Sequence, residues 1–296
     1  MANRTLRTQR IAKPAVRLSS GDLFLTRQGA DTEDAVALMS DLGAYMAPHP
    51  RYHFHGYAGD QITGDSKFFD RTALGNHGVR GANLSEAQMF ANAGYMSTID
   101  PVGGATDSVI RLPNLNFDFL GGEKMIAYWL GKVTPEGTDQ PVFGDGGSAT
   151  YPGFRAICKT TGKLQIALYD SDSDTAFSGT TVNTVFDGTL HSFAFVFDGQ
   201  AKKYGFWTDE IYDTGLGGVY ATLTSGSIDC RNSNTLNIGQ ASPASAASTF
   251  GIATQTRALA ILRLSATDAM PSVATLTNVF KQLRANPSKP ILGGAF

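Results

Sequence analysis

The chain has 296 residues, of which 42% are hydrophobic and 17% charged, with a net charge of −2 and a sequence pI of about 6.2. The low charge content, the 33 glycines and the 18 phenylalanines favour β-structure over a helical bundle. The near-neutral charge provides no global basic field for nucleic acid, and no apolar run approaches the roughly 20 residues that a membrane span requires.

Residues 1–50 are expected to form an extended anchoring arm followed by a short helix. Thr32 can cap a helix over residues 31–46, whose apolar side chains recur at helical spacing and which two following prolines terminate. Basic side chains precede any acidic one, and they could contact an acidic partner surface or belong to a solvated terminus. They are Arg4, Arg7, Arg10, Lys13 and Arg17. The terminus lacks the apolar segment of a secretory signal, so we expect synthesis in the cytoplasm.

From residue 51 onward the hydrophobic period changes to two, which is typical of half-buried strands. Short runs of strand-forming residues follow, separated by clusters of Gly, Asp and Ser. The predicted strands are Arg51–Tyr57, Lys124–Leu130, Gln140–Phe143, Gly153–Lys159, Lys163–Tyr169, Thr189–Phe197, Lys202–Thr208, Thr235–Ile238 and Arg257–Leu264. Many short strands with turns at this spacing predict a β-sandwich or jelly roll.

A C-terminal helix is predicted to close the domain at residue 287. Ser272 can cap it, and Asn286 with Pro287 ends it. Its apolar residues form one stripe, comprising Val273, Leu276, Val279, Phe280 and Leu283. Residues 288–296 are expected to form a C-terminal tail, whose apolar, glycine-rich end Ile291–Phe296 suits burial at a subunit contact. Cys158 and Cys230 have no C-x-x-C or histidine context, so no zinc site or disulfide is expected.

Three segments in the order of the chain resemble the concanavalin A-like, or laminin-G-like, jelly-roll family. Residues 70–78 resemble the family's early D-x-S-G-x-G-N-H-G turn, and residues 190–199 resemble its W-H-H-V-A-x-V-Y-D-G strand and hairpin. Residues 262–287 resemble an R-x-L-S…N-P ending that occurs on phage tail and fibre proteins. Leu190 departs from the pattern, because it replaces the usual tryptophan. The expected fold is mainly β, a concanavalin A-like sandwich over residues 51–287 with an N-terminal arm, a short N-terminal helix and a C-terminal helix.

This resemblance implies a bacteriophage virion protein made in the host cytoplasm, of the tail-fibre, tail-appendage or head-decoration type. Its expected partners are other virion proteins and further copies of itself, with a trimer as the expected assembly. The alternative is a carbohydrate-binding, lectin-like module that recognises a host-surface glycan. Fold alone does not decide between these functions.

Glycoside hydrolysis is the enzyme activity to consider for such a fold. A pair of carboxylates about 5–5.5 Å apart is typical of retaining glycosidases, and the sequence contains no two glutamates close together. We therefore expect no catalytic residue and no enzyme activity. His77 and His191 are expected to be structural, because no serine or cysteine nucleophile motif accompanies them.

The remaining candidate sites concern metal and sugar. Asp170, Asp172 and Asp174 have the alternating carboxylates of a calcium loop, but Asp and Ser residues are also typical of a solvated turn, which is the favoured interpretation. His53 and His55 are expected on one face of a strand, where they could share a metal or line an interface. Trp207 and Tyr204 are the candidates for stacking on a sugar. They lie on opposite faces of one strand, so only one can be exposed. No cofactor other than calcium is suggested.

Overall fold

The computed structural model describes residues 52–60, 67–72, 74–99, 108–112, 117, 119, 121–146, 152–170, 177–214, 218–222, 229, 231, 235–240 and 252–288. The anchoring arm with its basic residues, the helix predicted over residues 31–46 and the tail beyond residue 288 lie outside these ranges. No helix among the described residues is long and apolar enough to cross a membrane.

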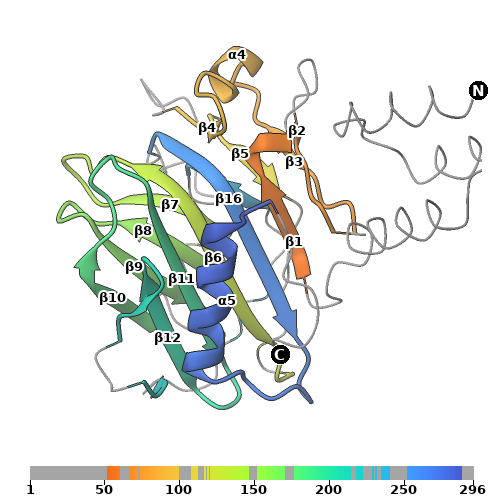
Figure 1. The fold of residues 1–296 in the computed structure, drawn as a ribbon, viewed down its shortest axis with the longest axis vertical. Helices are drawn as coiled ribbons and strands as arrows, with labels where there is room; N and C mark the ends of the chain where they lie inside the picture. The colour runs from red at the N-terminus through yellow and green to blue at the C-terminus, as the bar shows by residue number, and fades with distance from the viewer. Residues whose placement is uncertain are drawn as a thin grey trace, which may run out of the picture. The chain divides into compact units, whose positions relative to one another are not determined.

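The described chain forms two antiparallel sheets and a C-terminal helix (Figure 1). Sheet A has the order β1-β16-β6-β11-β12-β13, with β14 beside β12 and β4 beside β16. Its strands are β1 Tyr52–Tyr57, β4 Met96–Ser97, β6 Lys124–Val133, β11 His191–Asp198, β12 Lys203–Thr208, β13 Ile211–Tyr212, β14 Ala221–Thr222 and β16 Thr254–Leu264. The predicted mainly β sandwich fold is confirmed.

Sheet B has the order β10-β9-β8-β7-β15-β5-β3-β2. Its strands are β2 Lys67–Phe68, β3 Gly78–Arg80, β5 Ile110–Leu112, β7 Gln140–Gly144, β8 Gly153–Cys158, β9 Lys163–Tyr169, β10 Phe177–Thr184 and β15 Leu236–Ile238. Two short helical turns, η1 Ala58–Asp60 and α4 Glu86–Met89, connect strands.

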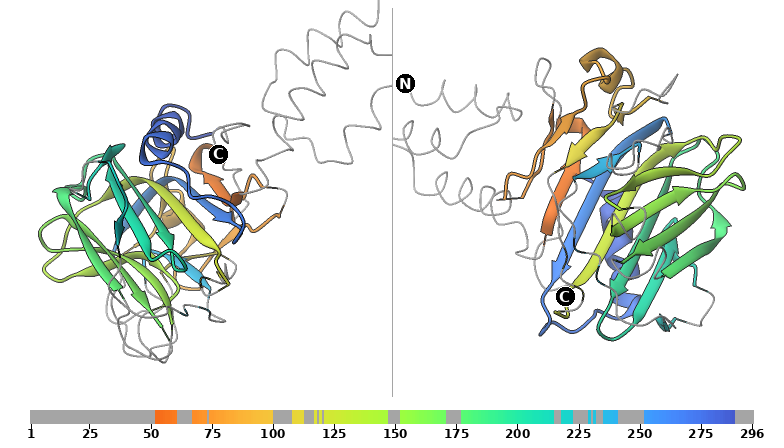
Figure 2. Two further views of the ribbon diagram at one scale, coloured as in Figure 1. Left: turned by 90° about the horizontal axis from the view of Figure 1, so that it is seen from below. Right: turned by 180° about the vertical axis from the view of Figure 1, so that it is seen from behind.

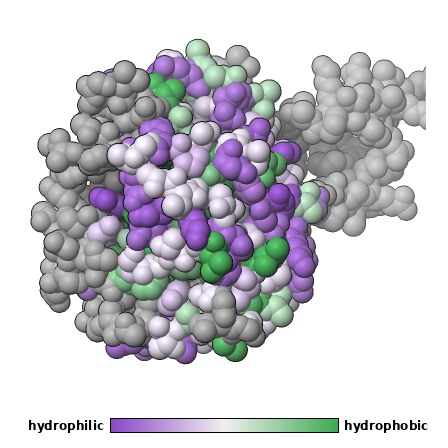
Figure 3. Space-filling view, turned by 90° about the vertical axis from the view of Figure 1, so that its left-hand side faces the viewer, coloured by the Kyte–Doolittle hydropathy of each residue, from purple (hydrophilic) through white to green (hydrophobic). Residues whose placement is uncertain are grey.

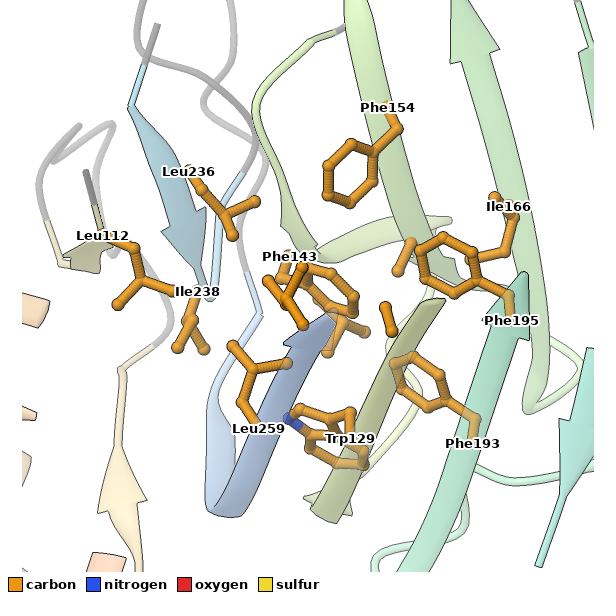
Figure 4. Packing of buried hydrophobic residues seen from close by; sticks show 14 of the residues in the cluster. Leu112, Trp129, Phe143, Phe154, Ile166, Phe193, Phe195, Leu236, Ile238 and Leu259 are labelled. Carbon is orange, nitrogen blue, oxygen red and sulfur yellow. The ribbon is translucent and has the colours of Figure 1, made fainter. Parts of the chain in front are cut away.

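The main core lies between the two sheets. Sheet B contributes Phe143, Phe154 and Ile166, which meet Trp129 and Phe193 of sheet A (Figure 4). The rings of Phe143 and Phe193 stack with their centroids 5.8 Å apart. Alternate residues of the longer strands, such as β8 and β11, point into this core, as the period of two predicted.

A second core lies on the outer face of sheet A, under helix α5 Val273–Ala285. Ser272 caps the helix by accepting the backbone N–H of Thr275, and Asn286 ends it. The apolar stripe predicted from the sequence is buried on the sheet, with Phe280 between the rings of Tyr128 and Trp207. Strands β6 and β11 are therefore buried on both faces, which explains their almost continuous apolar runs.

The two outer faces of the sandwich consequently differ. Helix α5 covers the outer face of sheet A, and sheet B lies on the opposite side, as the two views of Figure 2 show. Side chains on the outer face of sheet B alternate with those of the core, and two of them, Ala167 and Asn237, are themselves buried.

Candidate functional site

The turn between β2 and β3 is organised by the carboxylate of Asp70. Its Oδ1 accepts the backbone N–H groups of His55 at 3.0 Å and Thr72 at 2.9 Å, and its Oδ2 accepts that of Asn76 at 2.8 Å. Nδ1 of His77 accepts the backbone N–H of Asp70 at 3.0 Å. This network explains why an Asp…Asn-His-Gly pattern occurs here, and it gives His77 a structural contact within the turn.

His53 and His55 do not share a face, which corrects the arrangement expected from an uninterrupted strand. The pairing of β1 with β16 shifts register between Tyr52 and Phe54. His53 lies beside Phe117, with ring centroids 6.1 Å apart, whereas Nε2 of His55 lies 3.1 Å from the carbonyl oxygen of Pro287. Burial, reinforced by Arg263, lowers the pKa of His53 to about 4.

The described residues contain no group of three or more His, Cys, Asp or Glu side chains that could hold a metal ion. Asp170 of the predicted calcium loop is 6% exposed at the end of β9. Asp172 and Asp174 lie outside the described residues, so the calcium loop stays a prediction.

The two aromatic residues predicted to stack on sugar have other contacts. Trp207 is completely buried under α5, where its Nε1 donates to Oγ1 of Thr277 at 2.8 Å. Tyr204 packs against the main core, 4.5 Å from the ring of Phe177. The prediction for Trp207 is therefore wrong, because the predicted C-terminal helix covers the face of the sheet to which its ring points.

A row of outward-facing residues crosses sheet B from edge to edge. Each member is directly paired with the next, because the registers of all eight strands align at this level. In strand order from β2 to β10, the row consists of Lys67, Val79, Arg111, Asn237, Gly144, Arg155, Ala167 and Ser178. We call this set the cross-strand row.

Arg155 and Tyr169 form a pair at the part of this face made by β8 and β9. The guanidinium carbon of Arg155 lies 5.2 Å from the centroid of the Tyr169 ring, and its Nε donates to the carbonyl oxygen of Gly146 at 2.6 Å. Both side chains are half-buried. The arrangement holds a planar cation and an aromatic ring in fixed positions.

Hydrogen-bonding side chains surround this pair. Nε2 of Gln165 donates to Oγ of Ser178, and Thr180 is paired with Gln165 in the register of β9 and β10. Ser178 and Thr180 are exposed. On the side of the molecule where β9 and β10 lie, hydrophilic and weakly polar residues predominate, and hydrophobic ones are scattered (Figure 3). This surface, comprising Arg155, Gln165, Tyr169, Ser178 and Thr180, is termed the platform.

A second polar cluster lies at the start of β11, centred on His191. Its Nδ1 is 2.6 Å from Oδ2 of Asp209, and its Nε2 is 3.1 Å from Oδ1 of Asp187. Oγ1 of Thr189 lies 3.0 Å from the same Nε2. Burial acts to lower the pKa of His191, but its hydrogen bonds to the two carboxylates outweigh burial and raise that pKa.

Arg284, in the last turn of α5, joins this cluster to the helix. Its Nη1 donates to Oδ1 of Asp209 at 2.6 Å, and its Nε lies 3.5 Å from Oε2 of Glu210. Glu210 also accepts hydrogen bonds from the hydroxyls of Ser192 and Tyr128. These contacts fix the C-terminal end of α5 on sheet A.

The turn that carries Asp209 and Glu210 has a strained backbone. Asp209 and Glu210 have φ values of 48° and 60°, and they form the two-residue turn of the β12–β13 hairpin, where Asn-Gly is favoured. Burial raises the pKa of Glu210, although Ser192 and Arg284 oppose it. Asp209 differs, because hydrogen bonds from His191, Ser192 and Arg284 outweigh burial and lower its pKa. Such clusters of strain and shifted pKa values occur at functional sites as well as in structural ion-pair networks.

The sequence analysis did not identify the platform. The predicted strands Gly153–Lys159 and Lys163–Tyr169 already place Arg155, Gln165 and Tyr169 on the polar phase of the alternation. That phase is the signal that could have located them. The contact between Asp209 and Arg284, 75 residues apart, has no such signal in the sequence.

Comparison with known proteins supports the fold without assigning a family. No family model matches the sequence, and no curated protein matches it. Among solved structures, the chain is similar to a Trypanosoma rangeli sialidase in complex with sialic acid, with a TM-score of 0.52 and 11% identity over 81% of this chain. It is also similar to the botulinum neurotoxin serotype D binding domain, with a TM-score of 0.51 and 10% identity over 80% of this chain. The matches span 34% and 53% of those two chains.

The expectation that the chain is not an enzyme is contradicted by these comparisons, because a sialidase chain contains this fold. The expectation relied on the absence of paired glutamates. Sialidases use a tyrosine nucleophile and are an exception to the two-carboxylate rule. The absence of paired glutamates therefore does not exclude glycosidase activity of that type. At this level of identity the similarity shows the fold and carries no active-site residue across.

Proposed function

We propose that this chain is a carbohydrate-binding domain that holds its ligand on the platform of sheet B. The observation that carries the proposal is the Arg155–Tyr169 pair, fixed beside the amide of Gln165 and the exposed hydroxyls of Ser178 and Thr180. The similarity to a sialidase solved with sialic acid and to a toxin binding domain supports it at the level of fold.

The chemistry of the platform suits a sugar. A saccharide has apolar C–H faces and a rim of hydroxyls, and amphipathic aromatic rings such as tyrosine contact the former. Guanidinium and amide groups hydrogen-bond to the sugar hydroxyls in fixed directions. A small number of well-placed polar groups around an aromatic ring is typical of small-molecule binding sites.

A glycan array followed by calorimetry on the best ligand tests the proposal. Tyr169→Ala should weaken binding at least about tenfold, which corresponds to about 1.4 kcal/mol. Tyr95→Ala is the matched control, because Tyr95 also lies beside a cation, 5.0 Å from Lys132 Nζ, but belongs to the loop before β4. Binding that is unchanged in Tyr169→Ala, or absent for every glycan, would refute the proposal.

Hydrolysis of a glycosidic bond is a second candidate function, which the Asp209–Glu210 turn favours. Adjacent carboxyl groups whose pKa values shift in opposite directions are typical of acid and base pairs in catalysis. Release of reducing ends from an oligosaccharide mixture tests it. Glu210→Gln should abolish the release, and Glu123→Gln should not, because Glu123 pairs with Arg263 outside this cluster.

A place on a bacteriophage particle stays a prediction from the family resemblance. The anchoring role of residues 1–50 and the trimer belong to the same prediction. Mass measurement of the purified chain tests the assembly, and a stable monomer would count against a role as a virion subunit.

A further inference from the structure

The edges of the two sheets are not protected equally. Strand β2, at one edge of sheet B, has two residues, one of them Lys67, and β13 and β14, at one edge of sheet A, have two residues each. Strand β1 is longer, but the turn that carries Asp70 covers its edge, where the backbone N–H of Arg71 donates to the carbonyl oxygen of His55 at 2.8 Å. Short strands, a lysine and a covering loop all prevent edge-to-edge pairing.

The remaining edge is β10, the last strand of sheet B and the longest strand at any of these edges. Its eight residues, Phe177–Thr184, include no charged residue and no proline, and five of them are exposed. Strand β10 lies at the left of Figure 1, so the view of Figure 3 faces this edge. The sequence of β10 therefore contains none of the features that keep an edge strand from pairing with another strand.

The register of β9 determines which backbone groups of β10 face outward. In the β8–β9 hairpin the backbone N–H of Lys159 donates to the carbonyl oxygen of Lys163 at 2.9 Å. Backbone groups of an antiparallel strand point to its two neighbours alternately, so Gln165 and Ala167, two and four residues after Lys163, direct theirs to β8. The residues between them direct theirs to β10.

A contact at the start of β9 agrees with this assignment, because the backbone N–H of Leu164 donates to Oγ1 of Thr181 on β10 at 3.1 Å. Ser178 and Thr180 are paired with the two β9 residues whose backbone groups point to β8. The N–H and C=O groups of Ser178 and Thr180 therefore point away from β9, to the open side of the strand. Gly179, between them, directs its own backbone groups to β9.

Two apolar side chains are exposed at the same edge of the sandwich. Val182 on β10 and Ile211 on β13 are each 64% exposed. They lie on either side of a contact between the sheets, in which Nδ2 of Asn183 donates to Oγ1 of Thr208, the residue paired with Ile211, at 3.2 Å. This contact accompanies a shift of register in the second half of β10. The first half is therefore the open part of the edge, and apolar surface that a partner can bury lies next to it.

From this geometry we infer that β10 is an interface at which two copies of the chain pair antiparallel about a two-fold axis at Gly179. Ser178 of one copy exchanges backbone hydrogen bonds with Thr180 of the other, on both sides of the axis. Gly179 lies at the axis itself, where the absence of a side chain lets the two strands approach. A second copy is the partner that these observations favour, because an uncharged strand does not repel an identical one and its outward groups are self-complementary.

Analytical ultracentrifugation of the full chain over a wide range of concentrations, with no glycan present, tests the inference. We expect a monomer at low concentration and a dimer at high concentration, because pairing of one strand with its own copy closes after two subunits. A monomer at every concentration, or a trimer, would overturn the inference. The inference does not depend on carbohydrate binding, so a monomer that binds a glycan would overturn the interface alone, and a dimer that binds none would overturn the proposed function alone.

Variants of Thr180 locate the interface. Thr180→Pro removes an outward N–H group that the pairing with β9 does not use, and the two-fold axis removes it from both copies at once. The dissociation constant of the dimer should rise at least about tenfold. Thr180→Val is the matched control, because it keeps the N–H group and the branched side chain, and it should change the dissociation constant by less than about threefold.

Thr180→Lys keeps the test valid if Thr180→Pro fails to fold, because position 180 is exposed and tolerates a long polar side chain. The lysines of two paired copies would repel each other, so the variant should be monomeric at low salt and should regain part of its dimer at about 0.5 M NaCl, where charges are screened. Dissociation constants that are the same for the wild type, Thr180→Pro and Thr180→Lys would refute β10 as the interface.

Discussion

Individual polar residues maintain this sandwich at points where the chain turns. Asp70 is the clearest case, because one carboxylate, 4% exposed, accepts hydrogen bonds from three backbone N–H groups and from the hydroxyl of Thr72. Its removal leaves several buried donors without an acceptor. Hydrogen bonds to a buried charged group contribute more than those between neutral groups.

We predict that Asp70→Ala lowers the free energy of unfolding by about 3 kcal/mol. Asp229→Ala should lower it by less than about 1 kcal/mol, since the Asp229–Arg231 ion pair lies at the surface. Urea denaturation followed by circular dichroism measures both values. A loss below 1 kcal/mol for Asp70→Ala would show that the turn does not depend on this carboxylate.

His191 gives the fold a dependence on pH. Its pKa is raised in the folded state, so its contribution to stability is complete below its unfolded pKa of about 6.5 and is lost as the pH rises through the folded pKa. Asp187 and Asp209 have lowered pKa values, that of Asp187 about 2, so their contributions are present above an unfolded pKa of about 3.9 and are lost at lower pH.

The difference in unfolding free energy between wild type and His191→Gln should therefore be largest near about pH 5 and should shrink toward alkaline pH. Denaturation curves between pH 4 and pH 9 measure this difference. A difference that stays constant over that range would mean that the ion pairs of His191 do not contribute. His77→Gln serves as a comparison, because Nδ1 of His77 accepts the backbone N–H of Asp70.

Among the secondary-structure elements, α5 makes the two outer faces of the sandwich different. The helix covers the outer face of sheet A with a stripe that includes Phe280, which is completely buried. Large side chains in such positions contribute several kcal/mol through both burial and packing.

We predict that Phe280→Ala lowers the free energy of unfolding by about 3–5 kcal/mol, because a cavity forms between Tyr128 and Trp207. Lys281→Ala, on the exposed side of the same helix, should change it by less than about 0.5 kcal/mol. Chemical denaturation with tryptophan fluorescence suits the test, since Trp207 is beside the mutated position. Equal effects of the two variants would contradict the docked position of α5.

The sequence predicted elements with a strong hydrophobic period and missed those without one. Strand Lys163–Tyr169 was predicted with the bounds that the structure has, because its apolar residues alternate clearly. Strand β10 was missed, since Phe177–Thr184 is mostly Thr, Ser, Gly and Asn and lies at the edge of sheet B, where one apolar anchor suffices. Helix α4 has only four residues, too few for a helical period.

For the molecule as a whole, the sequence could not predict which side chains share the outer face of sheet B. The cross-strand row joins residues from position 67 to position 237, and its alignment depends on the registers of seven strand pairs. A shift of one residue in any pair would turn its side chains to the other face. Only the assembled sheet shows which basic residues lie in line.

Among the described residues, the side chains of the two cores belong to residues 54–283. We therefore predict that a chain shortened to begin at Tyr45, where the compact unit that contains both cores begins, unfolds within about 2 °C of the full chain. Differential scanning calorimetry measures this difference. A decrease of 10 °C or more would mean that residues 1–44 contribute directly to the stability of the sandwich.

The position of α5 on the face opposite to sheet B also determines how the protein can be displayed. A support or label attached at the exposed Lys281 would lie on the side of the sandwich opposite to sheet B, and the exposed hydroxyls of Ser178 and Thr180 would face the solution. Many copies fixed in this way would all present the platform on the side away from the support, so a ligand with several binding units could bridge neighbouring copies and dissociate more slowly than from a single domain. An attachment on β9 or β10 would cover the platform and remove this advantage.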